Sequence, residues 1–380
     1  MDIKILTTYD VYNYGASLQA YALLLYFSKL GHDARLIKYQ PNYLSRKYDY
    51  WWVNPESKAS KYLLTRMIYR IGKFIQRQTT MKRKHAFDQF NHNFLKETNI
   101  TYHSYEELLK APPTGDLFLC GSDQIWNVLY EAGRDPAFFL EFVPPHKKKV
   151  SYAASFSYLD IDNKNLERIQ SSLKKFGAVS VREFHGINIL KRIGIEGQWV
   201  LDPVFLIQKR DWRKFAEQGN IKNFNQTAKY LLIYDFERNN LIKESALLFA
   251  KKNHLKIYAV TDTYPLRYAD KNFSGVGPIE FVKLIANSEA FFSNSFHGTV
   301  FSLIFHKPFF VFERHRHAVN SRMESLLTLF ETKERLITSI HQFEDVHDQN
   351  PDWDNIESIK TQQLKISESF IKLALQSITY

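Results

Sequence analysis

Residues 290–312, with the sequence AFFSNSFHGTVFSLIFHKPFFVF, decide the fold class of this chain. They predict a short apolar strand, a polar turn that carries His297 and Gly298, a buried helix, and a second strand that follows Pro308. The turn would lie at the carboxyl end of a strand, which is where open parallel sheets bind ligands. It would also begin a helix, whose unpaired N–H groups favour an anion. We therefore expect His297 to face a bound anion.

The same pattern recurs along the chain and predicts an α/β protein with two Rossmann-like domains that face each other across a cleft. Near the N-terminus, a strand at residues 3–8 precedes the turn Asn13–Gly15, a helix at 16–30 and a strand at 34–39. The pattern places the first domain at 1–165, with a basic helical insertion near 58–95, and the second at 166–345. A long helix within 346–380 is expected to pack across both domains. The opening lacks the Gly-x-Gly-x-x-Gly spacing, so dinucleotide binding is not supported.

Composition limits the class of protein. With 380 residues, of which 44% are hydrophobic, the chain can fill two cores of ordinary size. Its single cysteine, Cys120, lies in an apolar run, so we expect a core residue and exclude an intramolecular disulfide or a four-cysteine metal site. Neither a signal sequence nor a membrane-spanning run is recognised, and we expect a cytoplasmic protein. The net charge of +11 favours anionic partners without identifying them.

Several short polar turns are predicted at the carboxyl ends of strands and would therefore line one cleft. Arg182 can grip a carboxylate or phosphate with a bidentate fork, although an arginine after a strand also serves in ion pairs. His297 can bind phosphate or transfer a proton, or act as a cap or core residue. Asp123 can act as a base or cap a helix, and Asp202 is expected to fix its own turn. The turns are Asn13–Gly15, Gly121–Asp123, Ala154–Ser155, Arg182–Glu183, Asp202–Pro203 and Ser295–Gly298.

A basic, amphipathic helical segment is predicted at about Lys58–Phe94. One interpretation is an inserted helical hairpin whose apolar stripe packs on the domain and whose charges, including those of Lys82–Lys84, are solvated. The other is a surface that rests on anionic lipid headgroups, because aromatic residues at Tyr48–Trp52 precede the basic helices.

A second basic cluster, at Arg314–His317, includes Arg316 and is followed by Arg322. It is a candidate secondary anion site, and a solvated basic loop is the alternative. The histidines of the chain lack the spacing of a metal site, and we expect none. We also expect no nucleic-acid partner, because the positive charges are spread over many elements without a recognisable binding module.

With these residues in place, the chain resembles the polysaccharide pyruvyl transferase family over most of its length. The resemblance implies two Rossmann-like domains in the glycosyltransferase-B arrangement. It also implies phosphoenolpyruvate as pyruvyl donor, no further cofactor, and a saccharide hydroxyl pair as acceptor. Some relatives carry cysteine-rich segments, from which this chain departs. The matching motifs are NYGASLQAY at 13–21, GSDQIW at 121–126, SYAAS at 151–155, SVRE at 180–183, LDPV at 201–204, SFHG at 295–298, and Arg322 with Leu326 and Leu327.

The resemblance places the family's donor-binding arginine on Arg182 and its histidine on His297. From the chemistry of the residues, we expect Phe296 and Gly298 of the same turn also to bind the donor, and backbone N–H groups at residues 297–299 to complete the anion site. His297 is the candidate general acid, and Asp123 is the candidate base for the acceptor hydroxyl. The acceptor or a secondary anion is assigned to Asn13, Gly15, Ser122, Arg316 and Arg322.

The resemblance also implies an acceptor linked to polyprenyl diphosphate, used in capsule or exopolysaccharide synthesis at the inner face of the cytoplasmic membrane. Peripheral contact between the basic segment and anionic lipid would then follow. Two other functions stay open. One is a nucleotide-sugar-dependent glycosyltransferase of the same architecture, because a fold does not choose its donor. The other is a non-catalytic glycan-binding protein whose surface is the aromatic stretch Tyr48–Trp52.

Overall fold

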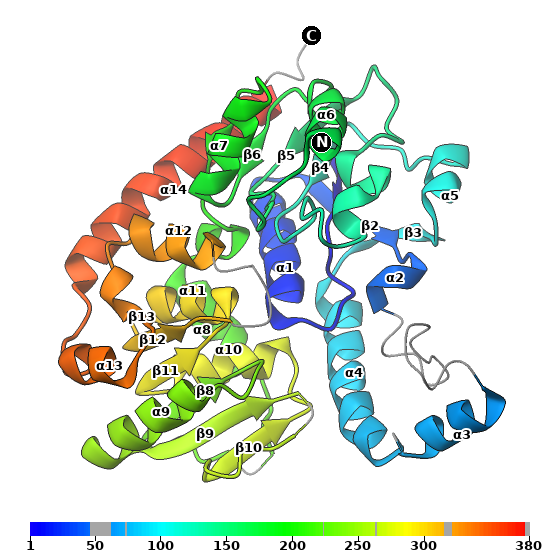
Figure 1. The fold of residues 1–380 in the computed structure, drawn as a ribbon. Helices are drawn as coiled ribbons and strands as arrows, with labels where there is room; N and C mark the ends of the chain where they lie inside the picture. The colour runs from blue at the N-terminus through cyan, green and yellow to red at the C-terminus, as the bar shows by residue number, and fades with distance from the viewer. Residues whose placement is uncertain (46–61, 73, 223, 263, 315–320, 377–380) are drawn as a thin grey trace.

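The computed structural model of the chain describes residues 1–45, 62–72, 74–222, 224–262, 264–314 and 321–376. Two parallel sheets with helices packed around them lie one above the other in Figure 1. This arrangement confirms the predicted fold class. None of the described helices is long and apolar enough to span a bilayer.

The first sheet has the strand order β3-β2-β1-β4-β5, and its paired strands are parallel. All four residues of β4 are buried, Cys120 among them, as its apolar sequence predicted. A strand that is apolar on both faces is typical of a parallel sheet covered by helices on both sides. The strands are β1 (Asp2–Leu6), β2 (Asp33–Tyr39), β3 (Glu97–Tyr102), β4 (Leu117–Cys120) and β5 (Lys148–Ser151).

A short parallel pair, β6 (Ser180–Val181) and β7 (Gln198–Trp199), continues alongside β5. Backbone bridges join Val150 to Ala178 and Ala154 to Val181. The residues that follow β6, including Arg182, are therefore positioned by the first sheet. The domain boundary at residue 165 stays a prediction.

The second sheet has the order β10-β9-β8-β11-β12-β13 and is parallel as well. Residues 290–312 form β11, the helix α11 (Phe296–Phe305) and β12, in the predicted order. Each residue of α11 is buried. The strands are β8 (Tyr230–Tyr234), β9 (Lys256–Thr261), β10 (Lys271–Ser274), β11 (Ala290–Ser293), β12 (Phe309–Phe312) and β13 (Leu336–Ile337).

The remaining helices connect and cover the strands. Those of the first half are α1 (Tyr14–Lys29), α2 (Asn42–Ser45), α3 (Leu63–Gly72), α4 (Phe74–Phe94), α5 (Tyr105–Lys110), α6 (Asn163–Leu173) and α7 (Phe184–Arg192). Those of the second half are α8 (Lys209–Glu217), α9 (Asn240–Lys252), α10 (Pro278–Ala286), α12 (Ser321–Leu329), α13 (Ile340–Val346) and α14 (Trp353–Gln376).

Helix α4 contacts both halves of the molecule, and one of its arginines is buried. Arg83 is 2% exposed; it donates to the hydroxyl of Tyr14 and the carbonyl of Tyr12, and pairs with Asp262 after β9. The expectation that the basic run Lys82–Lys84 is solvated is therefore wrong for Arg83. These partners and the ring of Phe87 offset the free-energy cost of burying the guanidinium of Arg83.

Helix α14 contacts both halves along its length. Near its start, Glu357 receives a hydrogen bond from His306 at the end of α11. Further on, the hydroxyl of Ser367 accepts from the backbone N–H of Leu201, and the carbonyl of Ala374 accepts from Lys148 of β5. In Figure 1 the helix runs along one side of the molecule from the second sheet to the first.

Candidate functional site

The predicted site residues meet where the carboxyl ends of the two sheets approach each other. Ser122 and Asp123 follow β4, Arg182 follows β6, and His297 follows β11 in the first turn of α11. The expectation that site residues follow the carboxyl ends of parallel strands therefore located a cluster with residues from both sheets.

One carboxylate oxygen joins three of these side chains. Oδ2 of Asp202 accepts from Nη1 of Arg182 at 2.8 Å and from the hydroxyl of Ser122 at 3.0 Å. Nε2 of His297 lies 3.3 Å from the same oxygen. The two atoms are close enough for an ion pair when the imidazole is protonated, but they do not form a hydrogen bond, and Nε2 is buried without a hydrogen-bond partner. Arg182 and His297 are therefore neighbours through a shared partner.

The electrostatics of this group favour charged side chains despite burial. Burial alone would raise the pKa of Asp202, but His297 and Arg182 outweigh it and hold that pKa below its ordinary value. Burial likewise opposes the charge of Arg182, and Asp202, Asp123 and Glu183 together raise its pKa above the usual range. The network thus keeps an ion pair inside the protein.

The imidazole of His297 lies against the backbone of Gly15 at the start of α1. A Cβ atom at Gly15 would come within 1.9 Å of Nδ1 of His297, so a side chain there would displace the ring. Gly15 therefore acts by letting the ring of His297 approach the backbone of α1, and its assignment to an acceptor or secondary anion stays a prediction. His297 is only 5% exposed, and Ser295 caps the helix, which excludes a cap role for His297.

Asp123 retains access to solvent at the edge of the cluster. Its Oδ2 accepts from the hydroxyl of Thr8, its Oδ1 is 4.0 Å from Nη2 of Arg182, and its side chain is 16% exposed. Its φ of 77° is in the left-handed region, an uncommon conformation for a residue with a side chain that often marks functional sites. No helix begins there, so the helix-cap alternative for Asp123 is excluded.

Two arginines lie close to the ring of Phe296. The guanidinium carbon of Arg182 lies 4.4 Å from the ring centroid, and that of Arg322 lies 5.7 Å away. Arg322 makes no hydrogen bond or ion pair with the residues that the structure describes. Burial and then repulsion from Arg182 lower the pKa of Arg322 to about 10. An added anion would favour the charged form and so offset both effects.

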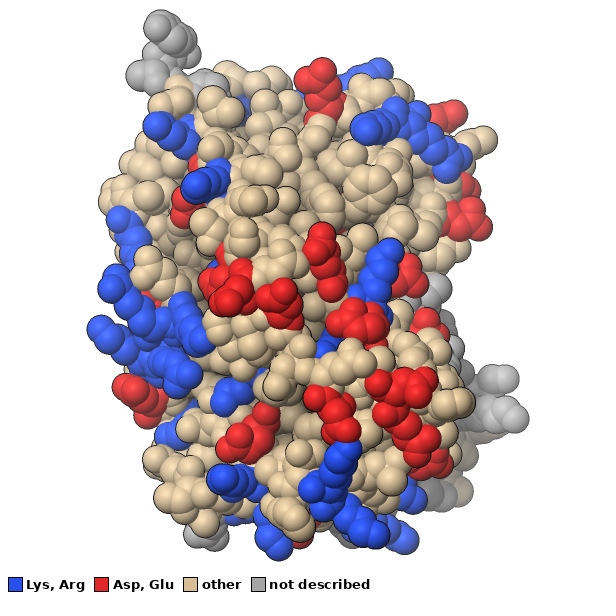
Figure 2. All heavy atoms as spheres, turned by 90° about the vertical axis from the view of Figure 1, so that its left-hand side faces the viewer, with Lys and Arg blue, Asp and Glu red and all other residues tan. Residues whose placement is uncertain are grey.

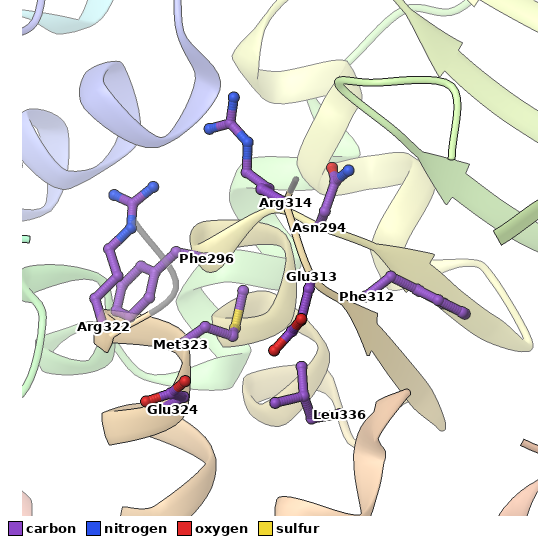
Figure 3. Close-up of a pocket in the computed structure, with 9 residues that line it drawn as sticks. All are labelled: Asn294, Phe296, Phe312, Glu313, Arg314, Arg322, Met323, Glu324 and Leu336. Atoms are coloured by element: carbon purple, nitrogen blue, oxygen red, sulfur yellow. The ribbon is translucent and has the colours of Figure 1, made fainter. Parts of the chain in front are cut away.

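A cavity of about 10 Å³, enough for about one water molecule, lies beside Arg322. Figure 3 shows that the guanidinium groups of Arg322 and Arg314 point to the same side of Phe296, while Glu313 and Glu324 point away. Arg314 is paired with Glu237 at 3.3 Å. Arg322 is therefore the arginine of this pair that is available to an incoming anion.

Several predicted contacts have a structural use instead. The side chain of Asn13 caps α1 by accepting from the N–H groups of Gly15 and Ala16. In α11, the N–H of Gly298 donates to the hydroxyl of Ser295 and that of Thr299 to the Ser295 carbonyl. The expected anion site built from N–H groups 297–299 is therefore wrong for Gly298 and Thr299, because both groups are already paired.

Gly298 has a packing role that the sequence did not reveal. A Cβ atom at this position would lie 2.6 Å from the ring of Phe291 in β11. The glycine therefore lets α11 pack closely on its preceding strand, and this closeness fixes the position of His297.

Some predictions fall outside the described residues. Arg316 and the stretch Tyr48–Trp52 are among them, as are the histidines at 315 and 317. In the part of the chain that the structure describes, no three His, Cys, Asp or Glu side chains are grouped to hold a metal ion.

Sequence reasoning missed two acidic residues of the site. Asp202 does fix its turn, since its Oδ1 accepts from the N–H of Val204, but its second oxygen is the centre of the network. Buried Glu183 accepts through Oε1 from the N–H groups of Phe156 and Ser157 and thus holds the loop after β5. Their place after predicted strands was the available signal.

Comparison with solved structures supports the fold. UDP-N-acetylglucosamine 2-epimerase from Rickettsia bellii is similar, with 14% identity and a TM-score of 0.51, over 100% of this chain and 96% of that one. The glycosyltransferase SnogD from Streptomyces nogalater gives 10% identity and a TM-score of 0.49 over 99% of each chain. At these identities the first likeness shows the two-domain fold of glycosyltransferase-B proteins and nothing about activity.

No curated protein sequence matches this chain. A family model does match it, and the match covers residues 13–316, from the cap of α1 to beyond β12. That range includes Asp123, Arg182, Asp202 and His297, the residues that meet in the structure. The chain therefore belongs to the polysaccharide pyruvyl transferase family.

Proposed function

We propose that this protein transfers pyruvate from phosphoenolpyruvate to two hydroxyl groups of a saccharide, which forms a cyclic ketal. The observation that carries the proposal is Arg322, a partly buried guanidinium that makes no ion pair with the described residues and lies near Phe296 and the charge of Arg182. Phosphoenolpyruvate carries a carboxylate and a phosphate, and arginine suits both groups.

Arg182 is proposed to bind the donor through its second edge. Its Nη1 is committed to Asp202, whereas its Nε and Nη2 are buried without hydrogen-bond partners. Each of the two atoms lies 4.0 Å from a carboxylate oxygen, Nε from Glu183 and Nη2 from Asp123, which is beyond hydrogen-bond distance. A buried donor without a hydrogen bond costs about 1–3 kcal/mol, so a carboxylate or phosphate that reaches these atoms would remove that cost. Arg182 and Arg322 would then hold the donor together, close to Phe296.

The proposed reaction conserves atoms and charge. A proton is added to C3 of the enol, one sugar hydroxyl attacks C2, the C2–O bond to phosphate breaks, and the neighbouring hydroxyl closes the ketal. Of the two hydroxyl protons, one replaces the proton given to C3 and the other leaves with inorganic phosphate. The protein must therefore supply one acid and one base near the two substrates.

His297 and Asp123 are the proposed acid and base. The ring of His297 is held between Gly15 and Asp202, so its position is fixed before any substrate binds. Asp123 is the carboxylate of the cluster that keeps contact with solvent, as an incoming hydroxyl requires. The proposed acceptor is a saccharide carried on polyprenyl diphosphate for capsule or exopolysaccharide synthesis at the cytoplasmic face of the membrane.

The direct test is incubation with phosphoenolpyruvate and a panel of galactose-, glucose- and mannose-containing acceptors, with detection of added pyruvate by mass and of released phosphate. His297→Ala is expected to lower turnover roughly a hundredfold or more, and Asp123→Asn to lower it as well. Near-normal turnover in either variant would discard that residue's role.

A second measurement tests the donor site. Arg322→Gln should raise the KM for phosphoenolpyruvate roughly tenfold to a hundredfold, as expected for the loss of a charge-assisted contact. Arg210→Gln, on the exposed surface of α8, is the matched control. Thermal stabilisation by a nucleotide sugar, with none by phosphoenolpyruvate, would favour the glycosyltransferase alternative and overturn the proposal.

A further inference from the structure

Helix α3 exposes a continuous apolar face. Leu63, Leu64 and Met67 are 78%, 71% and 54% exposed, and they lie within about one turn of the helix. Single exposed apolar residues are common, but neighbouring ones on the same helix mark an interaction surface. The expected packing of this stripe onto the domain is therefore wrong for these three residues.

The charge of the same segment has one sign. Residues 57–87 contain nine lysines and arginines and no aspartate or glutamate, and they account for most of the net charge of +11. Arg66 is exposed on α3 among the apolar residues. Apolar residues combined with basic residues are typical of helices that lie in the headgroup region of an anionic bilayer.

The position of α3 leaves this face accessible. Figure 1 shows α3 at the far end of α4, away from both sheets. The other end of α4 is anchored, because Phe87 and Phe90 are buried and Arg83 binds both halves of the molecule. By contrast, the face that carries α14 has acidic residues across its middle as well as basic ones (Figure 2).

We propose that α3 docks on an anionic lipid bilayer, with Leu63, Leu64 and Met67 inserted between headgroups and Arg66 at the phosphates. A nucleic acid would be attracted by the basic residues but would gain little from exposed leucines. This inference rests on the surface of α3 and holds whether or not phosphoenolpyruvate is the donor. It would place the site near saccharides that are carried on a membrane lipid.

The test is sedimentation of the full chain with vesicles of phosphatidylcholine alone or of phosphatidylcholine with phosphatidylglycerol. Binding is expected only with phosphatidylglycerol and should weaken as salt is added. The triple variant Leu63→Ser, Leu64→Ser and Met67→Ser should lose roughly tenfold or more of that binding. The matched control replaces Leu247 and Leu248 of α9, which are 42% and 43% exposed, with serine and should bind normally.

Two results would overturn the proposal. One is equal binding by the triple variant and the control, and the other is no binding to phosphatidylglycerol vesicles at low salt. Retention by RNA or DNA without vesicle binding would assign the basic segment to nucleic acid instead. Circular dichroism and transfer to a soluble acceptor check that the variants fold. Lost vesicle binding with intact transfer separates this proposal from the proposed function.

Discussion

Three side chains that are distant in the sequence meet at one oxygen of Asp202. Ser122 is 80 residues before it and Arg182 is 20 residues before it, while His297 comes from the other sheet. Because the carboxylate serves all three, a change at any of them alters the others, and their effects on turnover should not add. Single substitutions will therefore measure the network and not an isolated contact.

The charged form of Asp10, in the loop after β1, is disfavoured by its surroundings. Burial raises the pKa of Asp10 to about 6, and Asp88 and Glu97 add to the shift. Since this folded-state pKa is above the unfolded value, the group stabilises the fold below about pH 4, and that contribution is lost as the pH rises through about 6.

Asp10→Asn should therefore raise the free energy of unfolding by roughly 1–3 kcal/mol at about pH 8 and change it little at about pH 3.5. Urea unfolding at both pH values measures this, with the exposed Asp160→Asn as control. An equal gain at both pH values would show that packing, and not ionisation, is responsible.

Arg182 and His297 could be predicted from the sequence because each follows a recognisable strand, and strand ends of parallel sheets converge. The contacts of the second oxygen of Asp202 could not be predicted from the sequence, because they depend on how the two sheets face each other. The sequence also could not show that Arg322 lacks an ion-pair partner among the described residues, because that depends on which side chains surround it in the fold.

At the scale of elements, the N-terminal ends of α1 and α11 contact each other through Gly15 and His297. The strand–helix–strand order around both was predictable, since apolar periodicity and the caps Asn13 and Ser295 mark them. Their contact was not predictable, because it joins residues 15 and 297.

Gly15→Ala should push His297 out of place, because the new methyl group would occupy the space of the ring. The expected loss of stability is about 1–3 kcal/mol, with a fall in turnover comparable to that of His297→Ala. A double-mutant cycle tests the cause, since the stability loss should largely disappear when Gly15→Ala is combined with His297→Ala. An unchanged loss in that background would contradict the steric explanation.

The burial of Arg83 could have been predicted from the helical periodicity of α4, although the basic composition of the segment suggests a solvated residue. Arg83, Phe87, Phe90 and Phe94 recur at helical spacing on α4, and the first three are buried. A run of three basic residues favours a solvated interpretation, but helical periodicity distinguishes the middle one from its neighbours. Tertiary packing thus overrides composition at this position.

At the scale of the whole molecule, Arg83 connects the inserted helix to both sheets. Tyr14 stacks on Phe281 of α10 at a centroid distance of 4.3 Å, and the guanidinium carbon of Arg83 lies 4.4 Å from the centroid of the Tyr14 ring. The two halves are therefore held together by an aromatic and cationic contact near the site.

Arg83→Met is expected to lower the free energy of unfolding by about 1–3 kcal/mol, because it leaves Asp262 without its ion-pair partner and the Tyr12 carbonyl without its donor. The partial exposure of Asp262 limits the loss. Lys82→Met, at an exposed neighbouring position, is the control for charge and helix propensity. Denaturant unfolding compares them, and equal effects of the two changes would disprove a special role of Arg83.

The burial of Cys120 has a practical consequence for following this molecule in solution. The thiol lies inside β4, and burial raises its pKa well above the usual range, so a reactive thiolate is scarce while the protein is folded. Because the chain has no other cysteine, a single new one at an exposed position such as Tyr62 or Leu248 would take a fluorophore selectively in the otherwise native sequence. Emission from a dye at position 62, next to the first residue of α3, would then report directly on the surroundings of that helix.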